Sequence, residues 1–280
     1  FQLNTFNGSV FLVQNVNSCG TDLAGADRDA SAATGATKRA PASMILRPKR
    51  TPSRTVSRAK NSGAMVVALV NDSSSPLAEQ AHFTLPLHVG VEKAVAATKS
   101  YLATLSAILH LVSVWSGKAD LQNAVASLPA SLEAAIALPQ QVSASALERV
   151  AHLVVLGRGL GYAISREIAL KLKEVCGIHA EAFSSAEFLH GPVTLVKNQF
   201  AIVDVTVEDE SLAAHRNQIE DVRSRGAAIV QLHHKGVDAQ ARVLPLLILQ
   251  RFYLDVEVVA RSRGINPDAP PGLNKVTKTV

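Results

Sequence analysis

Apolar and polar positions along the chain follow two periods, one typical of strands and one typical of helices. Short apolar runs closed by glycine or polar turns predict buried strands. They lie at residues 8–16, 65–70, 83–87, 153–156, 200–205 and 228–232. Stretches with apolar residues three or four positions apart predict helices. They lie at residues 92–115, 119–136, 143–150, 211–224 and 244–263. Because strands and helices alternate in both halves, we predict an α/β fold of two lobes with parallel sheets.

The clearest unit spans residues 151–196, where a glycine-rich turn follows the strand 153–156 and leads into a further helix. The apolar residues of this helix recur at helical spacing, and they are Ile164, Ile168, Leu172 and Val175. Glu167, Lys171 and Glu174 form a second stripe, whose side chains stack along one face. Two acids around a lysine are a candidate acid/base cluster. The same spacing is also common in solvated ion pairs worth a few tenths of a kcal/mol, so it leaves both interpretations open.

Two local motifs in this unit depend on the spacing of their residues. A dinucleotide-binding turn requires G-x-G-x-x-G, whereas here the third glycine is Gly161 and Tyr162 follows it. We therefore expect no nicotinamide cofactor, and no other cofactor is indicated. Ser184 and Glu187 have the spacing of a capping box at the start of a short helix that precedes His190.

Composition narrows the class of protein. Of the 280 residues, 48% are hydrophobic and 18% are charged, which is typical of a globular protein with one large or two ordinary domains. No apolar stretch has the length of a membrane span and no signal sequence opens the chain. The two cysteines, Cys19 and Cys176, form neither a disulfide framework nor a metal-binding spacing. We expect a soluble cytoplasmic protein without a metal and without a membrane partner.

The basic charge is local. Eight basic residues and no acidic ones lie between Lys38 and Lys60, and removing these eight charges from the net charge of +5 leaves −3. Such a segment can bind nucleic acid, face a phosphate group or simply be a solvated surface. Because no aromatic residues are interleaved with the basic ones, nucleic acid is the least favoured partner.

With these elements placed, the sequence resembles the double-SIS phosphosugar family, which includes the isomerase half of glucosamine-6-phosphate synthase, glucosamine-6-phosphate deaminases and phosphosugar isomerases. The motifs LGRG, ALKLKE, HAEAF and AEFLHGP stand in residues 151–196. GAMVVALVN, SPLAE and EKAVAATKSY stand in residues 59–115, and NPDAPPGLNKVTKT stands in the tail. Deaminase-like members are the more similar ones.

The resemblance implies two flavodoxin-like αβα SIS lobes that hold a sugar phosphate at strand carboxyl ends, which agrees with the rule for open α/β sheets. We expect a first lobe over residues 1–138, a second over residues 139–265 and an active-site tail over residues 266–280. The resemblance also implies a homodimer with a shared active site.

The resemblance further implies catalytic roles for five residues. Glu174 would be the base that moves a proton between C1 and C2 of the open sugar. Lys171 and Glu167 would orient substrate and base. His190, contributed by the neighbouring subunit, would open the sugar ring. Lys275 would close over the open-chain sugar.

The resemblance also implies substrate binding by five residues of the first lobe, and they are Cys19, Gly20, Thr21, Thr51 and Val95. The first lobe departs from the family, because residues 47–52 read RPKRTP where a Ser-Gln-Ser-Gly type turn is expected. Cations in this segment can hold phosphate by charge. The segment 23–58 is also short and polar, so the first lobe is degenerate or shortened there.

The resemblance therefore implies an aldose/ketose isomerase or deaminase that converts an amino-sugar phosphate, such as glucosamine 6-phosphate, to fructose 6-phosphate plus ammonia. The alternative is a non-catalytic regulatory SIS protein that binds a sugar phosphate. Synthase activity is not expected, because the chain opens at Phe1 with no glutaminase region ahead of the lobes.

Overall fold

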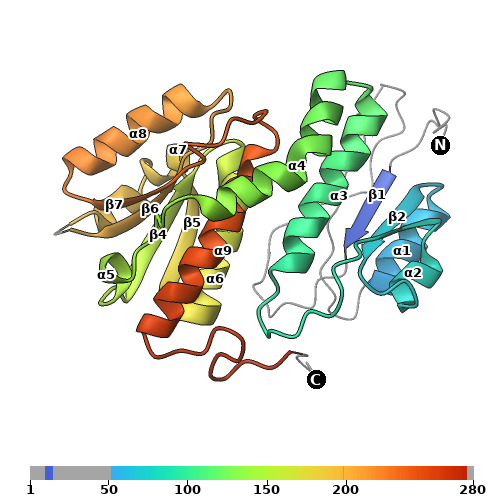
Figure 1. Ribbon diagram of the computed structural model, residues 1–280, viewed down its shortest axis with the longest axis horizontal. Coiled ribbons are helices and arrows are strands. Elements are labelled where there is room, and N and C mark those ends of the chain that lie inside the picture. The colour runs from blue at the N-terminus through green and yellow to red at the C-terminus, as the bar shows by residue number, and fades with distance from the viewer. Residues whose placement is uncertain (1–9, 15–51, 198, 276–280) are drawn as a thin grey trace. The chain divides into compact units, whose positions relative to one another are not determined.

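The computed structural model describes residues 10–14, 52–197 and 199–275 (Figure 1). The strands in these ranges are β1 (Val10–Gln14), β2 (Met65–Val70), β3 (Phe83–Pro86), β4 (His152–Gly157), β5 (His179–Ser184), β6 (Ala201–Val205) and β7 (Ala228–Leu232). The α-helices are α1 (Pro52–Asn61), α2 (Pro76–Gln80), α3 (Lys99–Ser116), α4 (Ala119–Ala137), α5 (Ala144–Leu147), α6 (Leu160–Cys176), α7 (Ser185–Phe188), α8 (Leu212–Ser224) and α9 (Leu244–Ser262). A 3-10 helix spans Pro192–Leu195.

The described residues divide into two compact units. The first holds residues 10–14, 52–92, 99–107 and 274–275, and the second holds residues 93–98, 108–197 and 199–273. Helix α3 begins in the first unit and ends in the second. The lobe boundaries expected from the sequence stay a prediction.

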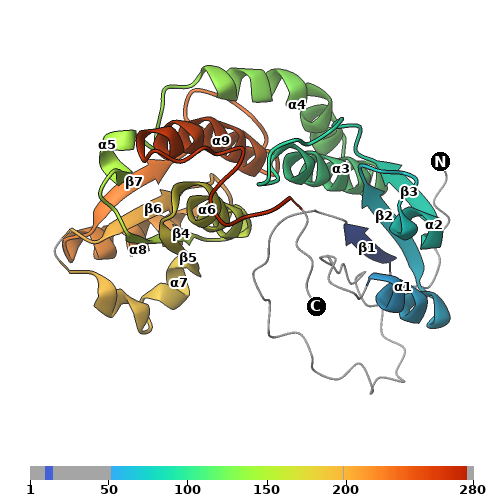
Figure 2. The ribbon, with the colours of Figure 1, turned by 90° about the horizontal axis from the view of Figure 1, so that it is seen from below.

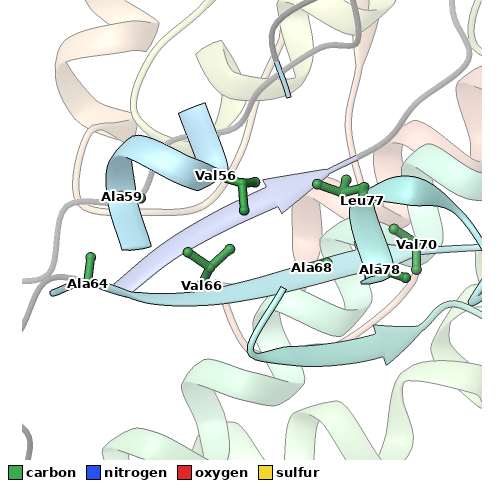
Figure 3. Close-up of a cluster of buried hydrophobic side chains, with 8 residues drawn as sticks. All are labelled: Val56, Ala59, Ala64, Val66, Ala68, Val70, Leu77 and Ala78. Carbon is green, nitrogen blue, oxygen red and sulfur yellow. The ribbon is translucent and has the colours of Figure 1, made fainter. Parts of the chain in front are cut away.

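The first unit contains a three-stranded parallel sheet in the order β1-β2-β3. Five of the six residues of β2 are buried, which explains its continuous apolar sequence. Small side chains from α1, β2, α2 and the turn before β2 form its core (Figure 3), and they are Val56, Ala59, Ala64, Val66, Ala68, Val70, Leu77 and Ala78. Ser75 begins α2 by accepting a hydrogen bond from the backbone N–H of Ala78 at 3.4 Å.

The second unit contains a four-stranded parallel sheet in the order β5-β4-β6-β7. Helix α6 connects β4 to β5, whereas α8 connects β6 to β7 in the opposite direction across the sheet. Because such crossovers are right-handed, α6 and α8 cover opposite faces (Figures 1 and 2). Ile219 and Val222 of α8 pack with Ile202 of β6 on one face, and α6 packs against α9 on the other.

The predicted α/β fold with two parallel sheets is confirmed, and individual elements differ in informative ways. Helix α3 begins at Lys99 rather than at residue 92, and the helix expected at 143–150 is limited to Ala144–Leu147. Strand β5 was not predicted. It lies at the edge of its sheet, and its first three residues alternate between exposed and buried, so it lacks the continuous apolar run of β4.

Candidate active site

Helix α6 presents two buried stripes. Its apolar residues Ile164, Ile168, Leu172 and Val175 are at most 4% exposed, as the sequence predicts. Glu167 and Lys171 are buried as well, at 4% and 1% exposed. This burial excludes the interpretation of Glu167 and Lys171 as a solvated surface pair. A buried ion pair is costly to desolvate and needs close partners.

The charged stripe and one tyrosine form a hydrogen-bonded chain. Lys171 Nζ donates a hydrogen bond to Glu174 Oε2 and lies 3.6 Å from Glu167 Oε1. The hydroxyl of Tyr253 donates to Glu167 Oε1 at 2.9 Å. Glu174 Oε1 is buried and has no hydrogen-bond partner within the described ranges. The structure therefore brings Glu167, Lys171 and Glu174 together and leaves one carboxylate oxygen of Glu174 unpartnered.

This arrangement suits proton transfer. A carboxylate that acts as a general base must be held in place and must keep an oxygen able to accept a proton. In Glu174, Oε2 is held by Lys171, and Oε1 is the oxygen without a partner. Lys171 supplies the positive charge that a buried carboxylate requires.

The charged stripe lies well beyond the glycine-rich turn along α6. At 1.5 Å per residue, Glu167 is about 10 Å and Glu174 about 21 Å along α6 from its first residue, Leu160. Glu174 is two residues from the end of α6 at Cys176, near the start of β5. The glycine-rich turn is therefore not part of the cluster.

The glycine-rich turn instead serves packing and helix capping. A Cβ on Gly157 would lie 2.4 Å from Ser165 Oγ, and a Cβ on Gly161 would lie 2.7 Å from the carbonyl oxygen of Val205. These glycines let α6 approach the ends of β4 and β6. The backbone N–H of Leu160 donates to Asp209 Oδ2 at 2.8 Å, so a carboxylate of the protein itself caps this helix.

His190 follows α7 and is exposed, and its backbone N–H donates to the carbonyl oxygen of Glu187 at 3.0 Å. No hydrogen bond or ion pair among the described residues joins the His190 side chain to Glu174. The predicted capping box is wrong, because Ser184, the N-cap of α7, makes no side-chain capping hydrogen bond. Ser184 is still the last residue of β5, in register with Gly157.

The other predicted site residues come from segments of the chain outside α6. Val95 is half-buried in the second unit, where its N–H donates to the carbonyl oxygen of Asp268 at 2.9 Å. Lys275 is half-buried and belongs to the first unit. The remaining predicted substrate-binding residues lie outside the described residues, and they are Cys19, Gly20, Thr21 and Thr51.

The sequence did not indicate Tyr253 or a buried polar cluster of three residues. Tyr253 lies in a helix that the sequence predicted, but only its contact with Glu167 reveals a role. His215 contacts Asp204 at 2.7 Å and Ser185 at 2.9 Å, and all three are at most 2% exposed. These three residues come from three separate elements, so no spacing in the sequence connects them.

A pocket of about 360 Å³ opens between α8 and the ends of β6 and β7. Arg216, Arg223 and Lys235 contribute cations to its lining, and Asp204 and Gln231 contribute polar groups. It lies on the α8 face of the sheet, away from the charged stripe of α6.

Within the described ranges, no three His, Cys, Asp or Glu side chains are placed to hold a metal ion. Among the helices of that same part, none is long and apolar enough to cross a membrane.

Comparison with known proteins agrees with this architecture. Residues 49–114 and 146–242 match the SIS domain family. The glutamine--fructose-6-phosphate aminotransferase [isomerizing] of Streptococcus agalactiae serotype V is 30% identical over 244 residues, 78% of this chain and 40% of that protein. The enzyme of the same name from Haemophilus ducreyi is 34% identical over 206 residues, 67% of this chain and 34% of that protein. The chain thus spans at most about 40% of the length of these relatives.

Several solved structures have a fold similar to that of this chain. A protein from Silicibacter pomeroyi DSS-3, described as belonging with the phosphosugar isomerases, has a TM-score of 0.71 and 34% identity over 81% of this chain and 73% of that one. The C-terminal domain of glucosamine-fructose-6-phosphate aminotransferase from Francisella tularensis has a TM-score of 0.73 and 22% identity over 94% of this chain and 87% of that one. Glucosamine-6-phosphate deaminase from Thermotoga maritima has a TM-score of 0.62 and 24% identity over 78% of this chain and 68% of that one. The latter two are evidence for the fold alone.

The chain belongs to the SIS domain family.

Proposed function

We propose that this chain moves a proton between C1 and C2 of an open-chain sugar phosphate, acting as an aldose/ketose isomerase or as the deaminase of an amino-sugar phosphate. One observation carries the proposal. The buried carboxylate of Glu174 has Oε2 bonded to Lys171 and Oε1 without a partner in the described part of the chain. The names of the relatives, an isomerizing aminotransferase and a phosphosugar isomerase, support the substrate class.

The proposed chemistry balances without a cofactor. For glucosamine 6-phosphate, Glu174 takes the proton from C2 of the open aldehyde while the ammonium group on C2 gives one proton to O1, and an enolamine forms. The proton is returned to C1, which leaves a protonated imine at C2. Water adds to C2 and ammonia leaves, giving fructose 6-phosphate. For an isomerase, the same two proton transfers at C2 and C1 pass through an enediol, and the transfer of one proton from O2 to O1 completes the reaction.

Further residues are assigned within this proposal. His190 would open the sugar ring from a neighbouring subunit of a homodimer, and its exposed position is compatible with that role. Lys275 would close over the open sugar. Binding of the sugar phosphate is assigned to Cys19, Gly20, Thr21, Thr51 and Val95.

The test is ammonia release and fructose 6-phosphate formation from glucosamine 6-phosphate, with other aldose phosphates assayed for ketose formation. Glu174→Gln is expected to lower kcat at least about a hundredfold, the usual range for loss of a general base. Glu181→Gln, which changes an exposed glutamate of β5, is the matched control and should leave kcat unchanged. Equal activity of Glu174→Gln and the wild type would contradict the proposal.

A non-catalytic sugar-phosphate sensor is the second candidate. The observation that favours it is the replacement of the family's phosphate-binding turn by RPKRTP at residues 47–52. Thermal stabilisation by the sugar phosphate with no turnover would establish the sensor. Neither stabilisation nor turnover with any of the sugar phosphates would exclude both candidates.

A further inference from the structure

Tyr253 joins the charged stripe of α6 to helix α9. The two helices pack against each other, and the Tyr253 hydroxyl donates to Glu167 Oε1 at 2.9 Å. The Glu167 side chain is only 3% exposed. A hydrogen bond to a buried carboxylate is stronger than one in water, because the local dielectric is low.

The hydrogen bond from Tyr253 bears on how Lys171 is shared. Two carboxylates face this one ammonium, and a single positive charge cannot neutralise both. Lys171 Nζ is hydrogen-bonded to Glu174 and stands 3.6 Å from Glu167 Oε1, the same oxygen that receives the tyrosine hydrogen bond. A hydrogen bond to a carboxylate stabilises its negative charge, so Glu167 depends less on the ammonium of Lys171. The position of Lys171, hydrogen-bonded to Glu174 and 3.6 Å from Glu167, agrees with this difference.

The position of Lys171 in turn decides the geometry of Glu174. Bonding of Oε2 to Lys171 fixes one oxygen of this carboxylate and leaves Oε1 as the unpartnered atom. If Lys171 moved toward Glu167, Glu174 would lose both its charge partner and the contact that orients it.

We propose that Tyr253 is a positioning residue for Glu174, which acts through Glu167 and Lys171 by directing the ammonium of Lys171 to Glu174. The inference rests on the proposed function of Glu174 as the base, and it adds a residue on a second helix to that site.

The first experiment compares the kinetics of Tyr253→Phe with those of the wild type. The substitution removes one oxygen and keeps the ring. We expect kcat to fall about tenfold, the scale of one hydrogen bond to a charged group, while KM changes less than twofold. Because Glu174 loses part of its ammonium partner, it should gain a proton at higher pH. The acid limb of the kcat profile should therefore move to higher pH.

Tyr162→Phe is the matched control. Tyr162 lies on α6, is half-buried, and its hydroxyl makes no hydrogen bond with the residues that the structure describes. It should leave kcat and the pH profile unchanged. A loss of kcat in Tyr253→Phe without movement of the acid limb would overturn the inference, because it would indicate only a structural role.

A second readout does not depend on turnover. In protein labelled with 13C at the glutamate carboxyls, the Glu174 resonance is the one that Glu174→Gln removes. Its titration midpoint should move to higher pH in Tyr253→Phe and stay in place in Tyr162→Phe. Glu167→Gln should move it to lower pH, because Lys171 then has one carboxylate partner. Unchanged midpoints in both Tyr253→Phe and Glu167→Gln would overturn the inference, whereas a wild type that turns over no sugar phosphate would contradict the proposed function alone.

Discussion

At the scale of single residues, two buried atoms lack a hydrogen-bond partner within the described ranges, Glu174 Oε1 and His234 Nδ1. More than nine in ten buried polar groups in native proteins are paired, so each exception calls for an explanation. For Glu174 the explanation is the proposed base. For His234, burial lowers the pKa of the imidazole, although Glu208 and Asp238 oppose the shift. A neutral ring leaves Nδ1 uncharged, which reduces the cost of its isolation.

Cys176 provides a prediction at this scale. Burial raises the pKa of its thiol to about 12, although the nearby Arg263 guanidinium opposes the shift, and Sγ contacts the carbonyl oxygen of Val256 at 3.7 Å. Thiolates are the reactive form, and with this pKa on the order of one thiol in ten thousand is ionised at pH 8. Iodoacetamide should therefore label Cys176 at least about a hundredfold more slowly in the folded chain than in urea, measured by site-resolved mass spectrometry. Equal rates would contradict the buried position.

At the scale of elements, the start of α6 depends on a residue far along the chain. Asp209 accepts hydrogen bonds from the backbone N–H of Leu160 at 2.8 Å and from the backbone N–H of Ser211 at 2.8 Å. Burial alone would raise the pKa of Asp209, but these bonds, the Ser211 hydroxyl and the Arg242 cation together lower it. The ionised carboxylate is thus the form that the fold prefers, as expected at a helix N-terminus.

Removing this cap should destabilise the second unit. Asp209→Ala is expected to lower the free energy of unfolding by about 1 kcal/mol at pH 7, the usual effect of losing a helix cap. Because the folded-state pKa is depressed, the contribution of the charge is present above the unfolded value of 3.8 and is lost as pH falls through the folded pKa. Urea unfolding at pH 7 and at lower pH measures the difference. Asp221→Ala, which removes an exposed pair with Arg225, should change stability by less than about 0.5 kcal/mol.

The sequence predicted those elements whose local pattern agrees with their final environment. The buried strand β2 and the strand β7 have the predicted bounds, 65–70 and 228–232. Strand β5 was missed because an edge strand needs no continuous apolar run. In the site, helical spacing grouped Glu167, Lys171 and Glu174, but spacing does not reveal burial. Tyr253 and Asp209 could not be found from the sequence, because each contacts α6 only after the chain has folded back.

At the scale of the whole molecule, the chain divides into two units of different make-up. The cluster of small Val, Ala and Leu side chains belongs to the first unit. The second unit buries many polar and charged groups, among them Lys171, His215 and Asp255. Buried charges make stability depend on pH wherever the folded and unfolded chains hold protons differently. We therefore expect acid to destabilise the second unit at a pH set by its own titrating groups.

His233 and His234, at the end of β7, are the groups expected to respond first as pH falls. Burial lowers the pKa of both below 6.5, and the Lys235 cation lowers both further. Between the folded pKa and 6.5 the unfolded chain binds more protons, so stability should be full above about pH 6.5 and decline below it. Urea unfolding from pH 8 to pH 5 should show this decline in the wild type. His234→Gln should flatten it, whereas His110→Gln, at an exposed position of α3, should not. If the free energy of unfolding falls with pH equally steeply in the wild type and in His234→Gln, His234 binds protons equally in the folded and the unfolded chain.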